Sequence, residues 1–186
     1  MKCYVKDYPR PQFVRDNWVN LNGSWDFRFD DGNQGEKEKW YEKFQGDKKI
    51  NVPFTFETKL SGIHDETRHD FVWYRREIQA DAARLEKEDY ILHFEGSDYI
   101  TKVWVNGQFA GKQQPRGKQR WIDSNFGCWY VPITGIWKTV WTEYASKVRL
   151  DKVKMTPVLE QGRLDVEYDL VVPESMMNGQ LFVSAT

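Results

Sequence analysis

Apolar and polar residues alternate along most of this chain, which is the pattern of half-buried β-strands. The period of two is clearest from Ser24 to Asp30, where Trp25, Phe27 and Phe29 share one face, and it returns from Gly135 to Tyr144. Further strands are predicted over 69–79, 90–95, 100–105, 108–111, 150–155, 164–172 and 181–185. The pattern therefore predicts an all-β protein.

Turn residues separate these segments. Asn106-Gly107 lies between two alternating runs and predicts a type I′ hairpin turn, because both residues of that turn need positive φ. The segment 50–54 contains Pro53 and predicts an edge strand or an irregular segment. The segment 36–44 has the spacing of a short helix, whereas 113–123 has no period and predicts a loop.

The aromatic residues divide the chain into two parts. All nine Trp precede residue 146, and the alternating pattern restarts at Val148. We therefore expect one domain over 1–146 and the beginning of a second over 147–186. The spacing of the strands in the second part is typical of an immunoglobulin-like sandwich.

Charge and composition exclude several functions. Lys and Arg total 27 against 28 Asp and Glu, so the net charge of -1 provides no field that would attract nucleic acid. No apolar run approaches the ~18 residues of a membrane span, and the N-terminus has no signal-peptide pattern, so we expect a cytoplasmic protein. Cys3 and Cys128 lack the spacing of a zinc site or a disulfide framework and are expected to be free thiols. We expect no metal ion and no cofactor.

Aromatic residues are frequent, with nine Trp, nine Tyr and eleven Phe making up 16% of the chain. They are strong β-formers and large core residues, so core packing explains most of them. A carbohydrate-binding surface is the other interpretation, because the C–H faces of sugars stack on aromatic rings.

Several carboxylates are paired, but none has the surroundings of a catalytic pair. In such a pair an apolar pocket raises the pKa of one carboxyl while the other stays solvated. The pairs occur in turns or on polar faces: Asp30 with Asp31, Asp65 with Glu66, Glu86 with Glu88, and Asp165 with Glu167. The three histidines are His64, His69 and His93. They lack the spacing of metal ligands, and no matching Ser or Cys motif accompanies them. We expect these histidines to be structural or surface residues.

Six motifs follow one another between residues 20 and 138. They are Asn20-Leu21-Asn22-Gly23-Ser24-Trp25-Asp26-Phe27, Val52-Pro53-Phe54, Trp73-Tyr74-Arg75-Arg76, Leu92-His93-Phe94-Glu95-Gly96, Val103-Trp104-Val105-Asn106-Gly107-Gln108 and Thr134-Gly135-Ile136-Trp137-Lys138. Their order resembles the N-terminal sugar-binding domain of family 2 glycoside hydrolases, which include β-galactosidases, β-glucuronidases and β-mannosidases. The resemblance implies a galactose-binding-like jelly-roll β-sandwich over 1–146, followed by the start of an immunoglobulin-like β-sandwich.

In that family a catalytic barrel comes next, and two of its glutamates perform retaining hydrolysis. The resemblance implies that no Glu of this chain has those roles and that the chain is a non-catalytic part that helps to form the carbohydrate site. The expected partners are a β-glycoside and either the missing barrel or further copies of the chain. The residues that best match the family's sugar-contacting loop are Asp123 and Asn125, with Trp121 or Trp129 as the stacking platform and Asn106 nearby.

The chain departs from the family after Lys112. The resemblance implies that roughly thirty residues, enough for about two strands, are absent there through a natural truncation, an engineered deletion or a splice in the sequence. Such a deletion leaves two strand edges unpaired unless a partner or a rearrangement covers them. Two other functions stay open, namely a self-standing carbohydrate-binding module or lectin without hydrolase activity, and a truncated remnant that binds nothing.

Overall fold

A computed structural model of the chain describes residues 9–10, 14–114, 127 and 133–177. The chain divides into two compact units. The first contains Met1–Gln79 and Leu92–Thr142, and the second contains Ala80–Ile91 and Glu143–Thr186.

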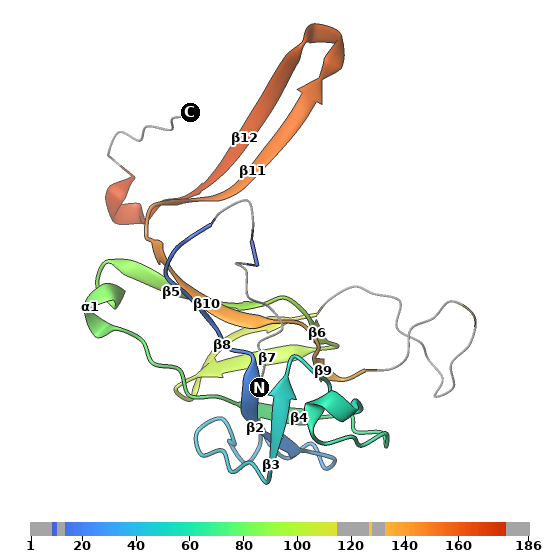
Figure 1. The fold of residues 1–186 in the computed structure, drawn as a ribbon. Coiled ribbons are helices and arrows are strands. Elements are labelled where there is room, and N and C mark those ends of the chain that lie inside the picture. Colours follow the sequence, from blue (N-terminus) through green and yellow to red (C-terminus); the bar gives the residue numbers. More distant parts are fainter. Residues whose placement is uncertain (1–8, 11–13, 115–126, 128–132, 178–186) are drawn as a thin grey trace. The chain divides into compact units, whose positions relative to one another are not determined.

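Strands dominate both units (Figure 1). They are β1 (Trp18–Asn20), β2 (Gly23–Phe29), β3 (Lys48–Val52), β4 (Val72–Arg75), β5 (Glu88–Phe94), β6 (Ser97–Asp98), β7 (Thr101–Val105), β8 (Gln108–Gln113), β9 (Gly135–Ile136), β10 (Val140–Ser146), β11 (Arg149–Val158) and β12 (Arg163–Val171). The helical elements are α1 (Ala82–Leu85) and the 3-10 turns η1 (Lys59–Ser61), η2 (Leu159–Gln161) and η3 (Glu174–Met176). The all-β prediction is confirmed. Within the described residues, no helix is long and apolar enough to cross a membrane.

Strand β2 is the centre of a three-stranded sheet in the first unit because it pairs along both of its edges. The sheet has the order β3-β2-β4, and β2 is antiparallel to both neighbours. Trp25 lies opposite Ile50 of β3, and Phe27 lies opposite Tyr74 of β4. Strand β3 is at the edge, as predicted for 50–54, since Pro53 has no amide hydrogen with which to continue a ladder.

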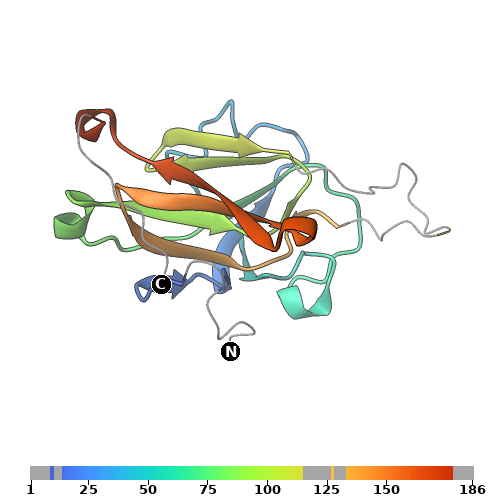
Figure 2. The same ribbon diagram turned by 90° about the horizontal axis from the view of Figure 1, so that it is seen from above.

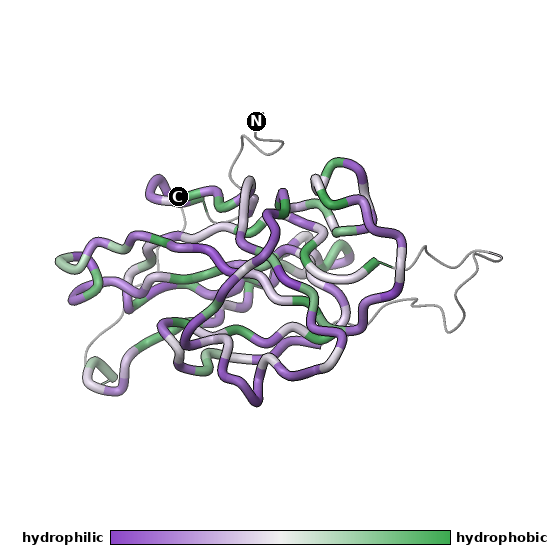
Figure 3. The backbone as a smooth tube through the Cα atoms, turned by 90° about the horizontal axis from the view of Figure 1, so that it is seen from below, coloured by the Kyte–Doolittle hydropathy of each residue, from purple (hydrophilic) through white to green (hydrophobic). Residues whose placement is uncertain are grey.

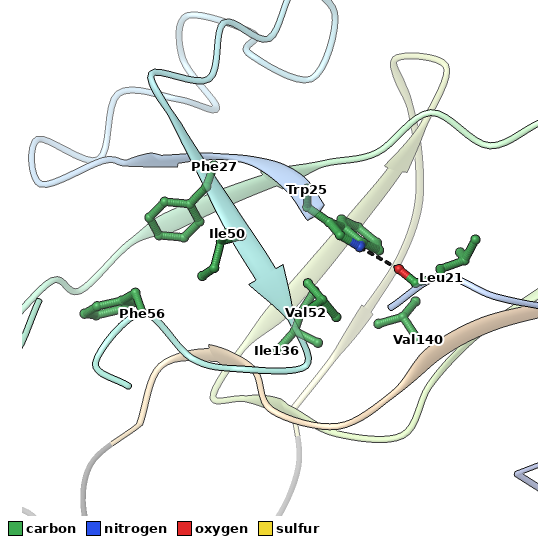
Figure 4. Close-up of a cluster of buried hydrophobic side chains, with 8 residues drawn as sticks. All are labelled: Leu21, Trp25, Phe27, Ile50, Val52, Phe56, Ile136 and Val140. Atoms are coloured by element: carbon green, nitrogen blue, oxygen red, sulfur yellow. Dashed lines mark hydrogen bonds between the residues drawn. The ribbon is translucent and has the colours of Figure 1, made fainter. Parts of the chain in front are cut away.

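The apolar face of β2 packs into the buried core of the first unit (Figure 4). The core consists of Leu21, Trp25, Phe27, Ile50, Val52, Phe56, Ile136 and Val140. Phe27 is fully buried, and its ring lies edge-on to the rings of Phe29 and Tyr74 at centroid distances of 5.0 and 5.1 Å. Trp25 Nε1 donates a 2.8 Å hydrogen bond to the Leu21 carbonyl, so its polar atom is satisfied inside the core. Each fully buried apolar side chain contributes about 1.5 to 3 kcal/mol.

Smaller strand pairs complete the first unit (Figure 2). Strands β7 and β8 form a hairpin that turns at Asn106 and Gly107, whose φ values of 50° and 80° are those of the predicted type I′ turn. Strand β6 pairs with β9, and β10 lies between β1 and β5. Strands β5 and β10 each contain residues of both units.

The helix predicted over 36–44 does not form. Lys39 has a φ of 55°, which a right-handed helix does not allow, and the segment is a series of turns. These turns bury Trp40, whose ring lies 3.8 Å from the Arg28 guanidinium. The burial of the Trp40 ring therefore determines the conformation of this segment more than its helical spacing of apolar residues does.

Two predicted strands are shorter in the structure. The segment 135–144 divides into β9 and β10, because the amides of Trp137 and Lys138 both donate to the carbonyl of Gly96 and so leave the strand ladder. A Cβ at Gly96 would lie 2.8 Å from the Trp137 ring, so this close approach requires glycine. The segment 69–79 keeps only the four residues of β4.

The second unit contains the hairpin β11–β12, which confirms the strands predicted over 150–155 and 164–172. One face carries the apolar cross-strand pairs Leu150–Leu170, Val153–Tyr168, Met155–Val166 and Pro157–Leu164. The other face is polar and includes an ion pair between Lys154 and Glu167 at 2.7 Å. Figure 3 shows hydrophobic and hydrophilic residues alternating over short distances along the described chain. The strand predicted over 181–185 lies outside the described residues.

Residues 80–91 also belong to the second unit, and Tyr144 contacts three of them. Its ring stacks on Tyr90 at 4.4 Å and lies 4.0 Å from the Arg84 guanidinium. Its hydroxyl accepts a 2.6 Å hydrogen bond from the amide of Asp81, whose side chain caps α1. The domain boundary at residue 146 stays a prediction.

A peptide of residues 147–186 is expected not to fold alone. An isolated two-stranded hairpin is at best marginally stable in water, and ordering each residue costs about 1.5 kcal/mol of conformational entropy. Circular dichroism during heating should show no cooperative transition for the monomeric peptide, whereas the full chain should show one. A cooperative transition in the monomeric peptide would mean that the domain boundary is wrong.

Candidate functional site

Asn106 is the one predicted sugar-binding residue that the structure describes. It is exposed at the turn between β7 and β8, and its φ of 50° gives it a turn-forming role. The predicted site residues and cysteines that lie outside the described residues are Asp123, Asn125, Trp121, Trp129, Cys3 and Cys128.

The described chain on either side of residues 115–132 is hydrogen-bonded to the first unit. At the end of β8, Nε2 of Gln114 donates to Oη of Tyr99 at 2.7 Å. Before β9, the amide of Thr134 donates to Oε1 of Glu57 at 2.9 Å, across 77 positions of sequence. These two contacts hold the points at which the chain leaves and rejoins the strands.

Gly135 begins β9 at a close approach between backbone and side chain. Its φ of 97° is easily reached by glycine and strained for other residues. A Cβ at this position would lie 2.2 Å from Oη of Tyr74. Gly135 also pairs with Asp98 in the β6–β9 ladder. Contacts with Glu57, Tyr74 and Asp98 therefore restrict the backbone at Thr134 and Gly135.

Three buried polar atoms belong to residues at or next to this junction and lack a hydrogen bond of good geometry among the described residues, although the Thr55 side chain and the Ile136 backbone lie near enough to lower the pKa values of Glu57 and Tyr74. They are Oγ1 of Thr55, Oε2 of Glu57 and Oη of Tyr74. An unpaired buried polar group costs about 1 to 3 kcal/mol, and native proteins contain few of them.

Burial raises the pKa of the Glu57 carboxyl above its ordinary range. Thr55, the amides of Glu57 and Thr134, and the charge of His69 each lower that pKa. Burial also raises the pKa of Tyr74 strongly; the backbone of Ile136 lowers this pKa, and the charge of Glu57 adds to the rise. The Tyr74 hydroxyl therefore stays protonated, and Glu57 binds a proton more readily than an exposed glutamate does.

His69 connects the loop before β4 to the end of β2. Its Nδ1 lies 2.7 Å from Oδ1 of Asp31, and its Nε2 lies 3.4 Å from Oδ2 of Asp65. Its ring stacks on Phe29 at a centroid distance of 3.6 Å. These contacts give His69 a structural role.

The paired carboxylates of the described residues have structural or surface positions. Asp30 is buried, and its Oδ2 accepts hydrogen bonds from the amide of Gly35 and the indole of Trp73. Asp165 and Glu167 are exposed on β12. In the part of the chain that the structure describes, no group of three or more His, Cys, Asp or Glu could hold a metal ion.

A second group of aromatic rings lies outside the buried core. Trp104 stacks on Tyr41 and on Trp73, at centroid distances of 5.3 and 5.2 Å. Phe109 is 59% exposed and lies edge-on to Trp104. Because each ring packs on another, their positions follow from packing without a bound sugar.

Sequence patterns did not identify Thr55, Glu57 and Tyr74 as a group. Tyr74 is one of several alternating residues in its strand, and Glu57 is a single carboxylate with no paired residue to mark it. The sequence signals are that Glu57 follows the Val52-Pro53-Phe54 motif and that Tyr74 lies in the Trp73-Tyr74-Arg75-Arg76 motif. Their proximity to one junction becomes visible only in the folded chain.

Comparison with known proteins connects this chain to sugar-binding domains. The model of the family described as "Glycosyl hydrolases family 2, sugar binding domain" matches residues 18–125. A β-galactosidase from Thermoanaerobacter pseudethanolicus is 31% identical over 96 residues, which are 51% of this chain and 11% of that protein. The chain thus spans a small part of that relative.

Solved structures share the fold at low sequence identity. A β-glucuronidase from an uncultured Clostridium species matches 87% of this chain and 35% of its own, with a TM-score of 0.66 and 18% identity. A β-glucuronidase from Faecalibacterium prausnitzii matches 88% of this chain and 37% of its own, with a TM-score of 0.63 and 15% identity. At these identities the likeness shows the fold alone, and it supports the predicted β-sandwich.

Removing the Tyr74 hydroxyl is expected to cost no stability. Because Oη is buried and lacks a hydrogen bond of good geometry among the described residues, Tyr74→Phe should leave the free energy of unfolding unchanged or raise it. The matched control Tyr144→Phe loses the hydrogen bond from Asp81 and should cost about 0.5 to 1.5 kcal/mol. Urea unfolding followed by fluorescence compares the two variants. An equal loss in both would show that Oη of Tyr74 is paired.

Proposed function

This chain belongs to glycoside hydrolase family 2, whose sugar-binding domain its residues 18–125 match, and we propose that it is the non-catalytic, carbohydrate-binding part of a β-glycosidase. The family match carries the proposal, and the six motifs lie in order along the chain. The relatives are named as a β-galactosidase and as β-glucuronidases, so the ligand class is a β-galactoside or a β-glucuronide. The two carboxylates that cleave the bond belong to a catalytic barrel outside these 186 residues.

Sugar binding is assigned to the segment between β8 and β9. Asp123 and Asn125 supply acceptors and donors for sugar hydroxyls, and Trp121 or Trp129 supplies an aromatic face. Asn106, exposed at the β7–β8 turn, completes the set. The hydrogen bonds that hold the chain on both sides of the segment support this assignment, because binding loops need a rigid scaffold.

The chain alone is expected to hydrolyse no aryl β-galactoside, β-glucuronide or β-mannoside. In this assignment it binds the sugar, while acid/base and nucleophile groups come from elsewhere. Release of 4-nitrophenol from the three glycosides measures this, with a full-length family relative as the positive control. Turnover by the pure chain that a single Asp or Glu substitution abolished would contradict the non-catalytic role.

Asp123 is expected to serve sugar binding and to contribute little to folding. A lost hydrogen bond between a carboxylate and a sugar hydroxyl costs about 1.5 to 3 kcal/mol of binding. Asp123→Ala, at the matching position of a full-length family relative, should therefore lower substrate affinity or turnover by at least about tenfold. Its melting temperature should stay near that of the parent, since surface substitutions change stability by no more than about 0.5 kcal/mol.

Two results would contradict the role of Asp123. Unchanged kinetics would remove Asp123 from the site, and a large loss of stability would assign it to the fold. Binding of methyl β-galactoside by the isolated wild-type chain, measured by NMR, distinguishes a self-standing binding module from a part that needs its barrel.

A further inference from the structure

The dipeptide Asn-Gly occurs at two places in the described part of the chain, and the surroundings of the two places differ. Asn22-Gly23 lies at the start of β2, and Asn106-Gly107 forms the turn between β7 and β8. An asparagine that precedes glycine is prone to spontaneous deamidation, because glycine has no Cβ to shield its backbone nitrogen from the preceding side chain. The contacts around each pair therefore determine which asparagine reacts in the folded chain.

Asn22 is held by hydrogen bonds at both atoms of its side-chain amide. Its Nδ2 donates to Oγ1 of Thr139 at 3.2 Å, and its Oδ1 accepts the amide hydrogen of Val140 at 3.2 Å. Gly23 is paired with Val52 in the β2–β3 ladder, and both Val52 and Val140 belong to the buried core. The Asn22 side chain therefore cannot turn toward the nitrogen of Gly23 without breaking several contacts beside the core.

Asn106 has none of these restraints. Its side chain is exposed and makes no hydrogen bond among the described residues. The amide of Gly107 makes none of the backbone hydrogen bonds of the described turns and loops. The pair Val105–Gln108 ends the β7–β8 ladder, so both turn residues lie outside it. Exposed loop tips open locally at little cost in free energy, which lets the side-chain carbonyl carbon of Asn106 approach the nitrogen of Gly107.

We propose that Asn106 is a site of spontaneous covalent modification, at which asparagine is converted into aspartate or isoaspartate. The nitrogen of Gly107 gives up its proton to hydroxide and bonds to Cγ of Asn106. The bond from Cγ to Nδ2 breaks, Nδ2 leaves as ammonia with a proton from water, and a cyclic imide remains. Water that adds at Cγ then gives aspartate, and water that adds at the α-carbonyl carbon gives isoaspartate, whose main chain runs through Cγ. Water is the only other reactant that the conversion consumes.

The product changes both the charge and the geometry of the β7–β8 turn. A carboxylate accepts hydrogen bonds but donates none, so the amide donor of Asn106 is lost. Isoaspartate adds a carbon atom to the main chain, and the type I′ turn then no longer fits between Val105 and Gln108. The turn packs on Glu42, whose Cγ would lie 3.5 Å from a Cβ at Gly107. Any effect on sugar binding rests on the proposed function, whereas the modification itself does not.

The test follows both asparagines in the same full chain. The purified chain is kept at mildly alkaline pH, folded in one sample and unfolded by urea in another, and tryptic peptides are analysed by mass spectrometry over time. Cleavage after Lys and Arg separates the two sites, because Asn22 lies in peptide 16–28 and Asn106 lies in peptide 103–112. Conversion of an amide into a carboxylate raises the peptide mass, and isoaspartyl methyltransferase labels isoaspartate. A sample digested at the start corrects for reaction during the digestion.

Two controls assign the mass increase to single residues. Fragment spectra distinguish Asn22 from Asn17 and Asn20 in the first peptide. Gln108 is the other amide side chain of the second peptide, and glutamine cyclises much more slowly because it forms a larger ring. The variant Asn106→Gln should therefore abolish the mass increase of peptide 103–112. A mass increase that persisted in this variant would overturn the proposal.

In the folded chain Asn106 should convert at least about tenfold faster than Asn22, since opening an exposed turn costs less free energy than opening the chain beside the core. In urea both should convert at similar rates, because glycine follows each of them and the unfolded chain protects neither. The proposal is overturned if Asn106 stays intact in the folded chain while the unfolded chain converts, or if Asn22 converts as fast as Asn106 in the folded chain. These results do not depend on sugar binding, so a failure of the proposed function would leave them unchanged.

Discussion

The first unit depends on the burial of one face of strand β2 between two neighbouring strands. A slip of one residue in either pairing would turn Trp25 and Phe27 from the core to the solvent, so the apolar pattern specifies the register. The opposite face supports the same register, because Asp26 contacts Lys49 of β3 and Arg75 of β4. These exposed ion pairs add little energy, and burial of the apolar face is the larger effect.

The same packing determines the geometry of the candidate site. Tyr74 lies opposite Phe27 in the β2–β4 ladder, and its ring packs edge-on against Phe27 at 5.1 Å. Its hydroxyl lies where Gly135 begins β9. One residue thus belongs to the core through its ring and to the junction through its hydroxyl. The position of β9 consequently depends on packing around a strand more than 100 residues earlier in the chain.

The sequence predicts those features that local pattern determines. Alternation identified β2 and the hairpin β11–β12, and Asn106-Gly107 identified the turn between β7 and β8, because each signal lies within a few neighbouring residues. The helix predicted over 36–44 was wrong because the burial of Trp40 requires turns there. The strand predicted over 135–144 forms as β9 and β10, with a break where the amides of Trp137 and Lys138 bond to Gly96. Motif order indicated the family, whereas the sugar-contacting residues stay predictions.

Glu57 was not predictable, because its character comes from burial and from a partner 77 positions away. Elsewhere in the unit a buried carboxylate is well paired, since Asp30 receives hydrogen bonds on both oxygens and closes a turn. Glu57 has one oxygen paired and the other buried without a hydrogen bond of good geometry among the described residues, beside Thr55 and Tyr74 in the same state. The same fold can therefore satisfy a buried carboxylate fully, and the incomplete pairing at Glu57 is a local property of the junction.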